Sequence, residues 1–212
     1  PSTTPAYIAD MAPFQVRALR GNYAPANGTS SLRSVMPAMW GDNDDIMRPW
    51  SGGEKSESGT KMYVHGGGHM DSSNNGLYSF DFAGDAQPTG WAVENAGRTG
   101  VSGDFAVGTT GMPTSVHTYD GMVDTGPYLY RFGGSSYPQG GFTSQFVRYD
   151  KAASTWTRIP SGGYAHFGGM ALANPRVGKI LVMERWVTYT TYAFYRTATN
   201  DWGTQRSVSG QW

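Results

Sequence analysis

Apolar residues recur along the chain in short runs that are separated by segments rich in glycine, serine, asparagine and aspartate. Three such runs are Met62–Gly67, Leu129–Gly134 and Lys179–Glu184. Short apolar runs bounded by turn-forming residues favour strands over helices. The 30 glycines, 13 tyrosines and 7 tryptophans point the same way, because glycine destabilises helices and aromatic side chains suit pleated surfaces. The pattern therefore predicts an all-β protein.

Each apolar run belongs to a longer pattern that occurs three times. A doublet of small or turn-forming residues precedes the run, and an aromatic strand and then a tryptophan follow it. The doublets are Gly52-Gly53, Asp120-Gly121 and Gly168-Gly169; the aromatic strands are Leu77–Asp81, Phe146–Asp150 and Tyr192–Arg196; the tryptophans are Trp91, Trp156 and Trp202. We therefore predict three successive units of four short antiparallel strands.

Aligning the three runs singles out two polar residues. His65 falls level with Phe132, so we expect a hydrogen-bonded core residue there and not a ligand. Arg131 falls level with apolar residues, which indicates either a special contact or an exposed strand edge. In the same alignment Val182 is level with His65, and Val64 and Leu181 are level with Arg131. Met183-Glu184 takes the place of the glycine pairs of the other two units.

The order of an inner strand, a strand ending in Gly-Gly, a strand ending in Tyr-Asp and a tryptophan strand resembles the kelch repeat. The resemblance spans about residues 50 to 207 and is strongest over Leu129–Ile159. It implies a β-propeller of four-stranded blades. The Gly pairs would allow positive φ and close backbone approach, the aromatics would fill the space between blades, and Asp150 would accept turn amides.

Three blades cannot close a ring, since propellers typically have four to eight. We therefore expect an incomplete ring, completed by further blades of a longer chain or by an oligomeric neighbour. The predicted divisions are an N-terminal segment at 1–49 with a possible strand at 14–20, blades at 50–96, 117–160 and 161–208, an inserted loop at 97–116, and the start of a further strand at 209–212.

Charge and composition exclude several function classes. The 16 basic and 16 acidic residues leave no net charge, which argues against nucleic-acid binding. No apolar run is long enough to insert into a membrane. The chain has no cysteine, so it has no disulfide and no thiolate metal ligand. We expect no cofactor.

In a kelch-like blade, the loops between the second and third strands lie on the same face as the links between blades. We call this the long-loop end, because the long segments 68–76, 96–116 and 135–144 fall there. Long loops on a rigid scaffold are where binding residues concentrate. Histidines near a carboxylate could hold a metal or act as acid and base, but hydrogen-bonded loop histidines are the more frequent outcome. The binding residues predicted for this end are His69, Asp71, Asn74, His117, Tyr119, Arg131, Tyr137 and His166.

The favoured function is a non-enzymatic binding or assembly module that contacts a protein or glycan, outside a cell or on a virus particle. The alternative is a sugar-directed enzyme of an epimerase-like or lyase-like kind, with His117, His166, Tyr119 and Arg131 around the propeller axis. Kelch-like propellers also include a copper radical oxidase, whose cysteine–tyrosine crosslink is impossible in this chain. A third possibility is a structural part of a large assembly.

Overall fold

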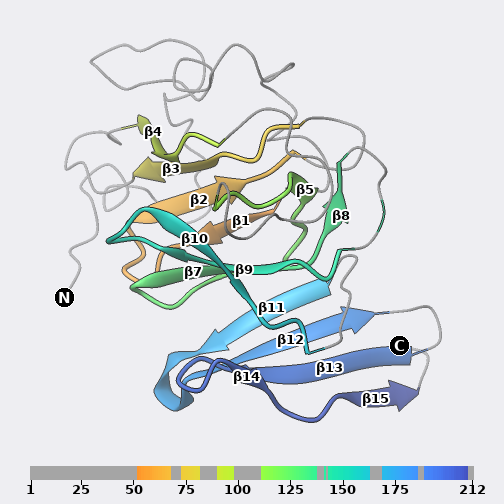
Figure 1. The fold of residues 1–212 in the computed structure, drawn as a ribbon. Helices are drawn as coiled ribbons and strands as arrows, with labels where there is room; N and C mark the ends of the chain where they lie inside the picture. The colour runs from red at the N-terminus through yellow and green to blue at the C-terminus, as the bar shows by residue number, and fades with distance from the viewer. Residues whose placement is uncertain are drawn as a thin grey trace, which may run out of the picture.

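The computed structural model describes residues 52–67, 73–81, 90–97, 111–137, 141, 143–162, 169–185 and 189–209. These residues form antiparallel strands and one short 3₁₀ turn, so the all-β prediction is confirmed (Figure 1). The predicted N-terminal segment, with its possible strand at 14–20, lies outside the described residues, and so does most of the inserted loop.

Three larger sheets follow one another along the chain, two of four strands and a third of five, and four strands of each are in sequence order. The first contains β1 (Gly53–Lys55), β2 (Lys61–His65), β3 (Leu77–Asp81) and β4 (Gly90–Asn95). The second contains β6 (Met122–Asp124), β7 (Tyr128–Phe132), β9 (Phe146–Asp150) and β10 (Thr155–Ile159). The third contains β11 (Gly169–Asn174), β12 (Lys179–Arg185), β13 (Tyr189–Arg196) and β14 (Asp201–Trp202), with η4 (Pro175–Val177) after β11 and β15 (Arg206–Ser209) also paired to β13.

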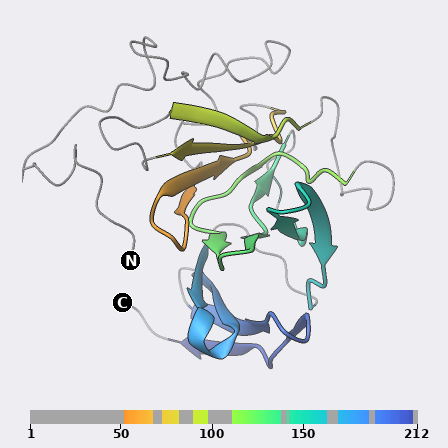
Figure 2. The ribbon, with the colours of Figure 1, turned by 90° about the vertical axis from the view of Figure 1, so that its left-hand side faces the viewer.

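The second sheet lies between the first and the third (Figures 1 and 2). Its first strand, β6, contacts the first strands of both neighbours, β1 and β11. Polar contacts tie these strands together: Asp124 N donates to Glu54 Oε1 at 3.2 Å, and Ala171 N donates to Asp120 O at 2.9 Å. The first strands of all three sheets therefore share one side of the molecule.

Aromatic side chains join each sheet to the next. Trp156 of β10 lies 5.0 Å from His65 of the first sheet, measured between ring centroids. Trp202 of β14 lies 5.8 Å from Phe132 of the second sheet in the same way. The tryptophan of one sheet thus contacts the same position on the preceding sheet in both cases.

The pairing of strands corrects the predicted alignment of the third unit by one residue. Met62 pairs with Phe80 and Phe80 with Trp91; in the second sheet the series is Leu129, Tyr149 and Trp156; in the third it is Ile180, Tyr195 and Trp202. Val182 is therefore level with Arg131, and Met183 is level with His65 and Phe132. The alignment was wrong there because the third unit lacks the glycine pair that anchors the other two.

Glycines of the predicted pairs have positive φ and approach other backbone closely, and Asp150 accepts turn amides, as predicted. Gly66 has φ 85°, and a Cβ there would lie 2.3 Å from Val116 O. Gly134 has φ 112° and approaches His117 O in the same way. Asp150 Oδ1 accepts hydrogen bonds from the amides of Ala152 and Ala153, both at 3.0 Å.

Candidate functional site

Five of the eight predicted binding residues are described, and they fall in three places. His117 and Tyr119 lie together, Arg131 lies between the first two sheets, and Asn74 and Tyr137 lie in loops of the long-loop end. His69, Asp71 and His166 lie outside the described residues, so their predicted roles stay predictions.

His117 and Tyr119 form the first of these places. His117 is buried in β5 (Val116–His117), which pairs with β8 (Ser135–Ser136) and not with the four-stranded second sheet, so it precedes the inner strand β6. The two rings are 5.9 Å apart, edge to face. Tyr119 is partly exposed, has φ 47° and has its pKa raised by burial, against a smaller effect of Ser135. A side chain other than glycine at positive φ is uncommon, and such positions cluster at functional sites.

Arg131 is fully buried, so the expectation of an exposed strand edge is wrong. Its Nη1 donates to Thr114 O at 2.8 Å and to His65 Nε2 at 3.1 Å. Its Nη2 donates to Gln145 Oε1 at 2.8 Å and to Gln145 O at 3.3 Å. The special contact is therefore a hydrogen-bond network inside the protein, which we call the Arg131 network.

His65 completes the Arg131 network as a neutral acceptor. Because Nε2 accepts from Arg131, the ring proton is on Nδ1, which donates to Gly76 O at 2.9 Å. Burial, and then the charge of Arg131, lower the pKa of His65 to about 3. The expectation of a hydrogen-bonded core histidine is confirmed.

The charge of Arg131 has no carboxylate beside it among the described residues. Its hydrogen bonds go to carbonyl oxygens and to the histidine ring, and burial lowers its pKa to about 9. The side chain stays charged at neutral pH, but it has no exposed surface with which to touch a ligand. Its position suits it to fixing two sheets together.

Asn74 also serves the local fold. Its Oδ1 accepts from Gly76 N at 2.8 Å and from the Tyr78 hydroxyl at 3.2 Å, which orders the entry into β3. Tyr137 is partly exposed after β8, and its amide donates to Ser115 O at 3.0 Å. Of these two residues, Tyr137 is the one whose side chain offers surface at the long-loop end.

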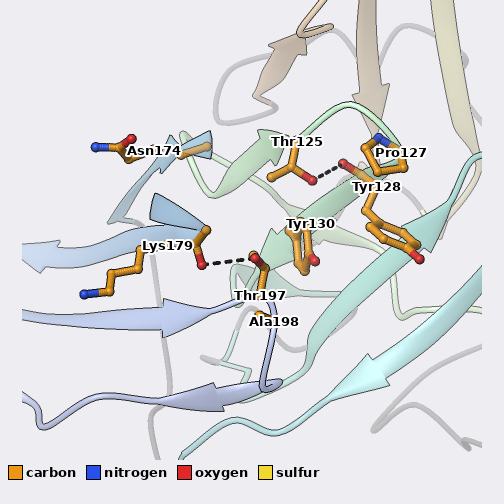
Figure 3. Close-up of a pocket in the computed structure, with 10 residues that line it drawn as sticks. Thr125, Pro127, Tyr128, Tyr130, Asn174, Lys179, Thr197 and Ala198 are labelled. Carbon is orange, nitrogen blue, oxygen red and sulfur yellow. Dashed lines mark hydrogen bonds between the residues drawn. The ribbon is translucent and has the colours of Figure 1, made fainter. Parts of the chain in front are cut away.

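Two cavities open at the opposite end, beside the turns that join first to second strands and third to fourth strands. We call this the short-turn end. The cavity in Figure 3, about 230 Å³, lies between the second and third sheets. The hydroxyls of Thr125 and Thr197 donate to Tyr128 O and Gly178 O, and the ends of Lys179 and Asn174 point away from Thr125 and Tyr128. The cavity thus offers a ligand little polar chemistry.

The second cavity, about 410 Å³, lies between the first two sheets at the same end. Its lysines are already engaged: Lys61 is paired with Glu94 at 3.1 Å, and Lys151 is paired with Asp124. The lining residues are Ser56, Glu57, Ser58, Thr60, Lys61, Tyr63, Gly126 and Lys151.

The described residues contain neither a metal-binding cluster nor a membrane-spanning helix. No group of three or more histidine, aspartate or glutamate side chains in them could hold a metal ion. None of their helices has the length and apolar character to cross a membrane.

Sequence reasoning missed Gln145 and Thr114 as partners of Arg131, and no residue pattern distinguishes them from other loop residues. It also missed an exposed apolar face on the third sheet. That face had a signal, because "MALA", "ILVM" and "YAFY" are apolar at successive positions, as in strands covered on both sides.

Comparison of the chain with protein-family models and with curated proteins found no match.

Proposed function

We propose that this chain is part of a kelch-like β-propeller and acts as a non-enzymatic binding or assembly module, extracellular or on a virus particle. The ligand is a protein or glycan, and it binds at the long-loop end. The incomplete ring is completed by further blades of a longer chain or by a neighbouring molecule.

The observation that carries the propeller part of the proposal is the repeated contact between sheets. In the second and third sheets alike, the tryptophan of the fourth strand lies on the same position of the sheet before it: Trp156 on His65, and Trp202 on Phe132. The first strands β1, β6 and β11 also lie beside one another. Sheets stacked face to face with their first strands together are the arrangement that radial repetition produces.

The difference between the two ends of the sheets supports the choice of binding end. At the short-turn end, compact turns satisfy their own backbone: Gly59 N donates to Ser56 O at 2.8 Å, and Asn200 N donates to Arg196 O at 2.9 Å. Two connections at the other end are much longer, those from His65 to Leu77 and from Asn95 to Val116, whereas the link from Arg185 to Tyr189 is short. Long connections on a rigid scaffold supply adaptable binding surface.

One observation favours the enzyme alternative, which we keep as the second candidate. Tyr119 is partly exposed at positive φ beside the buried ring of His117. A tyrosine next to a histidine could move a proton to or from a sugar. The Arg131 network adds nothing to this candidate, because Arg131 and His65 are fully buried.

A binding screen that also recovers the ligand tests both candidates. The chain is immobilised on a biosensor and a glycan panel is passed over it. Bound glycan is then eluted, its mass is measured by mass spectrometry, and its NMR spectrum is compared with that of the input glycan. We expect reversible binding and unchanged glycan. Tyr137→Ala should weaken binding about tenfold, the effect of losing one aromatic contact. Val177→Ala at the short-turn end should leave it unchanged.

Two results would overturn the proposal. Conversion of the eluted glycan that is lost in Tyr119→Phe would establish the enzyme instead. Equal loss of binding in Tyr137→Ala and Val177→Ala would remove the argument for the long-loop end. If no glycan binds, the same variants are tested with a peptide-display panel. If no peptide binds either, both proposed ligand classes are wrong.

A further inference from the structure

Equivalent cavities lie at the short-turn end between each pair of neighbouring sheets. Strand pairing sets Met62 level with Leu129, so Tyr63 and Tyr130 have the same position in the first and second sheets. Tyr130 lines the cavity of Figure 3, and Tyr63 lines the second cavity, which we call the Tyr63 cavity. The repeat thus builds both cavities in the same way, and they differ in the side chains that line them.

The hydroxyl of Tyr63 distinguishes the two cavities. Tyr63 is only 4% exposed, and its hydroxyl makes no hydrogen bond with the described residues. Burial, and then the charges of Glu94 and Asp124, raise the pKa of Tyr63 to about 12, so the hydroxyl keeps its proton at neutral pH. Tyr130 differs, because the charge of Arg148 lies near its hydroxyl and opposes the effect of burial on its pKa. Polar atoms of nearly buried side chains usually have a partner, so the Tyr63 hydroxyl is available to a ligand.

A chain of three hydroxyls on the turn between β1 and β2 leaves a second donor in the Tyr63 cavity. Ser56 Oγ accepts from the amides of Thr60 and Lys61, at 3.1 and 2.9 Å. Both of its lone pairs are then used, so its proton is directed to Ser58 Oγ at 3.0 Å. The hydroxyls of Ser58 and Thr60 are bonded to each other at 2.8 Å, which uses one of their two protons whichever residue donates. The other proton has no acceptor among the described residues and is free for a ligand.

The charged groups around the Tyr63 cavity nearly cancel. Lys61 Nζ is paired with Glu94 at 3.1 Å, and Lys151 is paired with Asp124. Glu57 also lines the cavity, is exposed and forms no ion pair with the described residues. A cationic ligand would be repelled by the two ammonium groups, and an anionic ligand by Glu57 and the carboxylates of the two pairs. The cavity therefore favours an uncharged, polar ligand.

We propose that the Tyr63 cavity binds an uncharged monosaccharide. A sugar hydroxyl donates and accepts at once, which matches a lining with a donor in Tyr63, a donor in the hydroxyl chain and an acceptor in Glu57. The volume of about 410 Å³ lies in the range of small-molecule sites, about 300–1,000 Å³. The site is at the opposite end of the sheets from the site of the proposed function and does not depend on it.

Hydrogen bonds, and not ring stacking, set the affinity of this site. Tyr63 is the aromatic residue of the lining, and Lys151 Nζ lies 4.9 Å from the centroid of its ring. Tyr63 also packs with Leu77 in the hydrophobic core. The ring therefore has no free face for a sugar, and we expect a dissociation constant of about 1 mM, as for a small ligand held by a few hydrogen bonds.

Titration of the full chain, followed by the NMR signals of its backbone amides, tests the site. The probes are D-glucose, D-galactose, D-mannose and N-acetyl-D-glucosamine, with acetate and methylammonium as charged probes. We expect saturable shifts at Ser58, Thr60 and Gly126 with at least one sugar and with neither charged probe. Tyr63→Phe and Glu57→Ala should each weaken sugar binding at least about fivefold, because each removes one hydrogen-bonding group.

Tyr130→Phe is the matched control, because it removes the equivalent hydroxyl from the other cavity and should leave sugar binding unchanged. Tyr63→Phe should not lower the midpoint of thermal unfolding, since its hydroxyl has no hydrogen bond to lose. Saturable binding by none of the sugars, tighter binding of a charged probe, or equal weakening in Tyr63→Phe and Tyr130→Phe would overturn the proposal. Sugar binding that is lost in Tyr137→Ala but kept in Tyr63→Phe would also overturn it, and would leave the proposed function at the long-loop end standing.

Discussion

The two contacts between sheets use the same geometry with different chemistry. Between the second and third sheets the contact is aromatic: Phe132 lies 5.8 Å from Tyr195 and from Trp202. Between the first and second sheets, Trp156 lies on His65, which accepts from Arg131. Val182, at the position equivalent to Arg131, is an ordinary buried apolar residue.

The comparison distinguishes the tryptophan contact, which both pairs of sheets share, from the Arg131 network, which only the first pair has. A tryptophan seated on a flat ring occurs in both contacts and needs only shape and apolar area. The Arg131 network occurs in one, where His65, Thr114 and Gln145 from three separate segments must meet around a buried cation. Such networks add little net stability, but they penalise incorrect pairing because a buried charge without partners is costly. We infer that the Arg131 network fixes which sheet packs on which.

Phe132→Ala should have the largest effect on stability. It removes a ring that packs against Phe146, Tyr195 and Trp202, so the free energy of unfolding should fall by about 3–5 kcal/mol. Chemical denaturation measures the loss. Phe194→Ala is the control: the ring of Phe194 is 43% exposed on the third sheet, so its loss should lower the free energy of unfolding by less than about 1 kcal/mol. Similar losses in both variants would contradict the aromatic contact as the main attachment of the third sheet.

Replacing His65 and Arg131 by apolar residues, as in the second contact, should have the next largest effect on the free energy of unfolding. His65→Phe or Arg131→Met alone should each cost about 1–3 kcal/mol, because each leaves buried polar groups of the network unsatisfied. The double variant replaces both partners with apolar groups, so its loss should be smaller than the sum by at least about 1 kcal/mol. Additive losses in this double-mutant cycle would show that Arg131 and His65 are not energetically coupled.

Much of the secondary structure could be predicted from residue patterns. Apolar runs, glycine pairs and tryptophans located four strands in each of the three sheets but not β15 of the third. Asp150 at its turn was predicted because a short carboxylate can accept neighbouring amides. The third unit was set one residue out of register, since a strand without a glycine pair can slide by one position without breaking the pattern.

The Arg131 network could be predicted only in part, for a physical reason. His65 was recognisable as a core residue from its alignment with Phe132. Arg131 was recognisable as a break in the apolar pattern. Its pairing with His65 was not, nor were Thr114 and Gln145, because these residues come from separate segments and meet only when the first two sheets pack. The binding site itself remains a prediction, as His69, Asp71 and His166 lie outside the described residues.

Acid pH should weaken the first contact more than the second. The pKa of His65 is about 3 in the folded chain and about 6.5 in the unfolded chain, so the unfolded state binds the extra proton between these values. The stabilising effect is complete above pH 6.5 and is lost as pH falls toward 3. Between pH 6.5 and 5 it should amount to about 1–2 kcal/mol. The His65→Phe/Arg131→Met double variant should lack this slope in denaturation curves, and an unchanged slope would assign the acid sensitivity to other groups.

Asp150→Ala should give the smallest effect, and it should be the same in the background of either contact. The carboxylate holds two turn amides between β9 and β10, at a partly exposed position with no bond to Phe132 or to the Arg131 network. Its loss should cost about 1 kcal/mol, as for other side chains that satisfy free backbone amides. Since the turn shares no partner with either contact, this cost should add to that of Phe132→Ala and of Arg131→Met within about 0.5 kcal/mol. A departure from additivity with Arg131→Met alone would mean that the turn and the first contact move together, and that the second sheet owes its position to the polar network more than to its tryptophan.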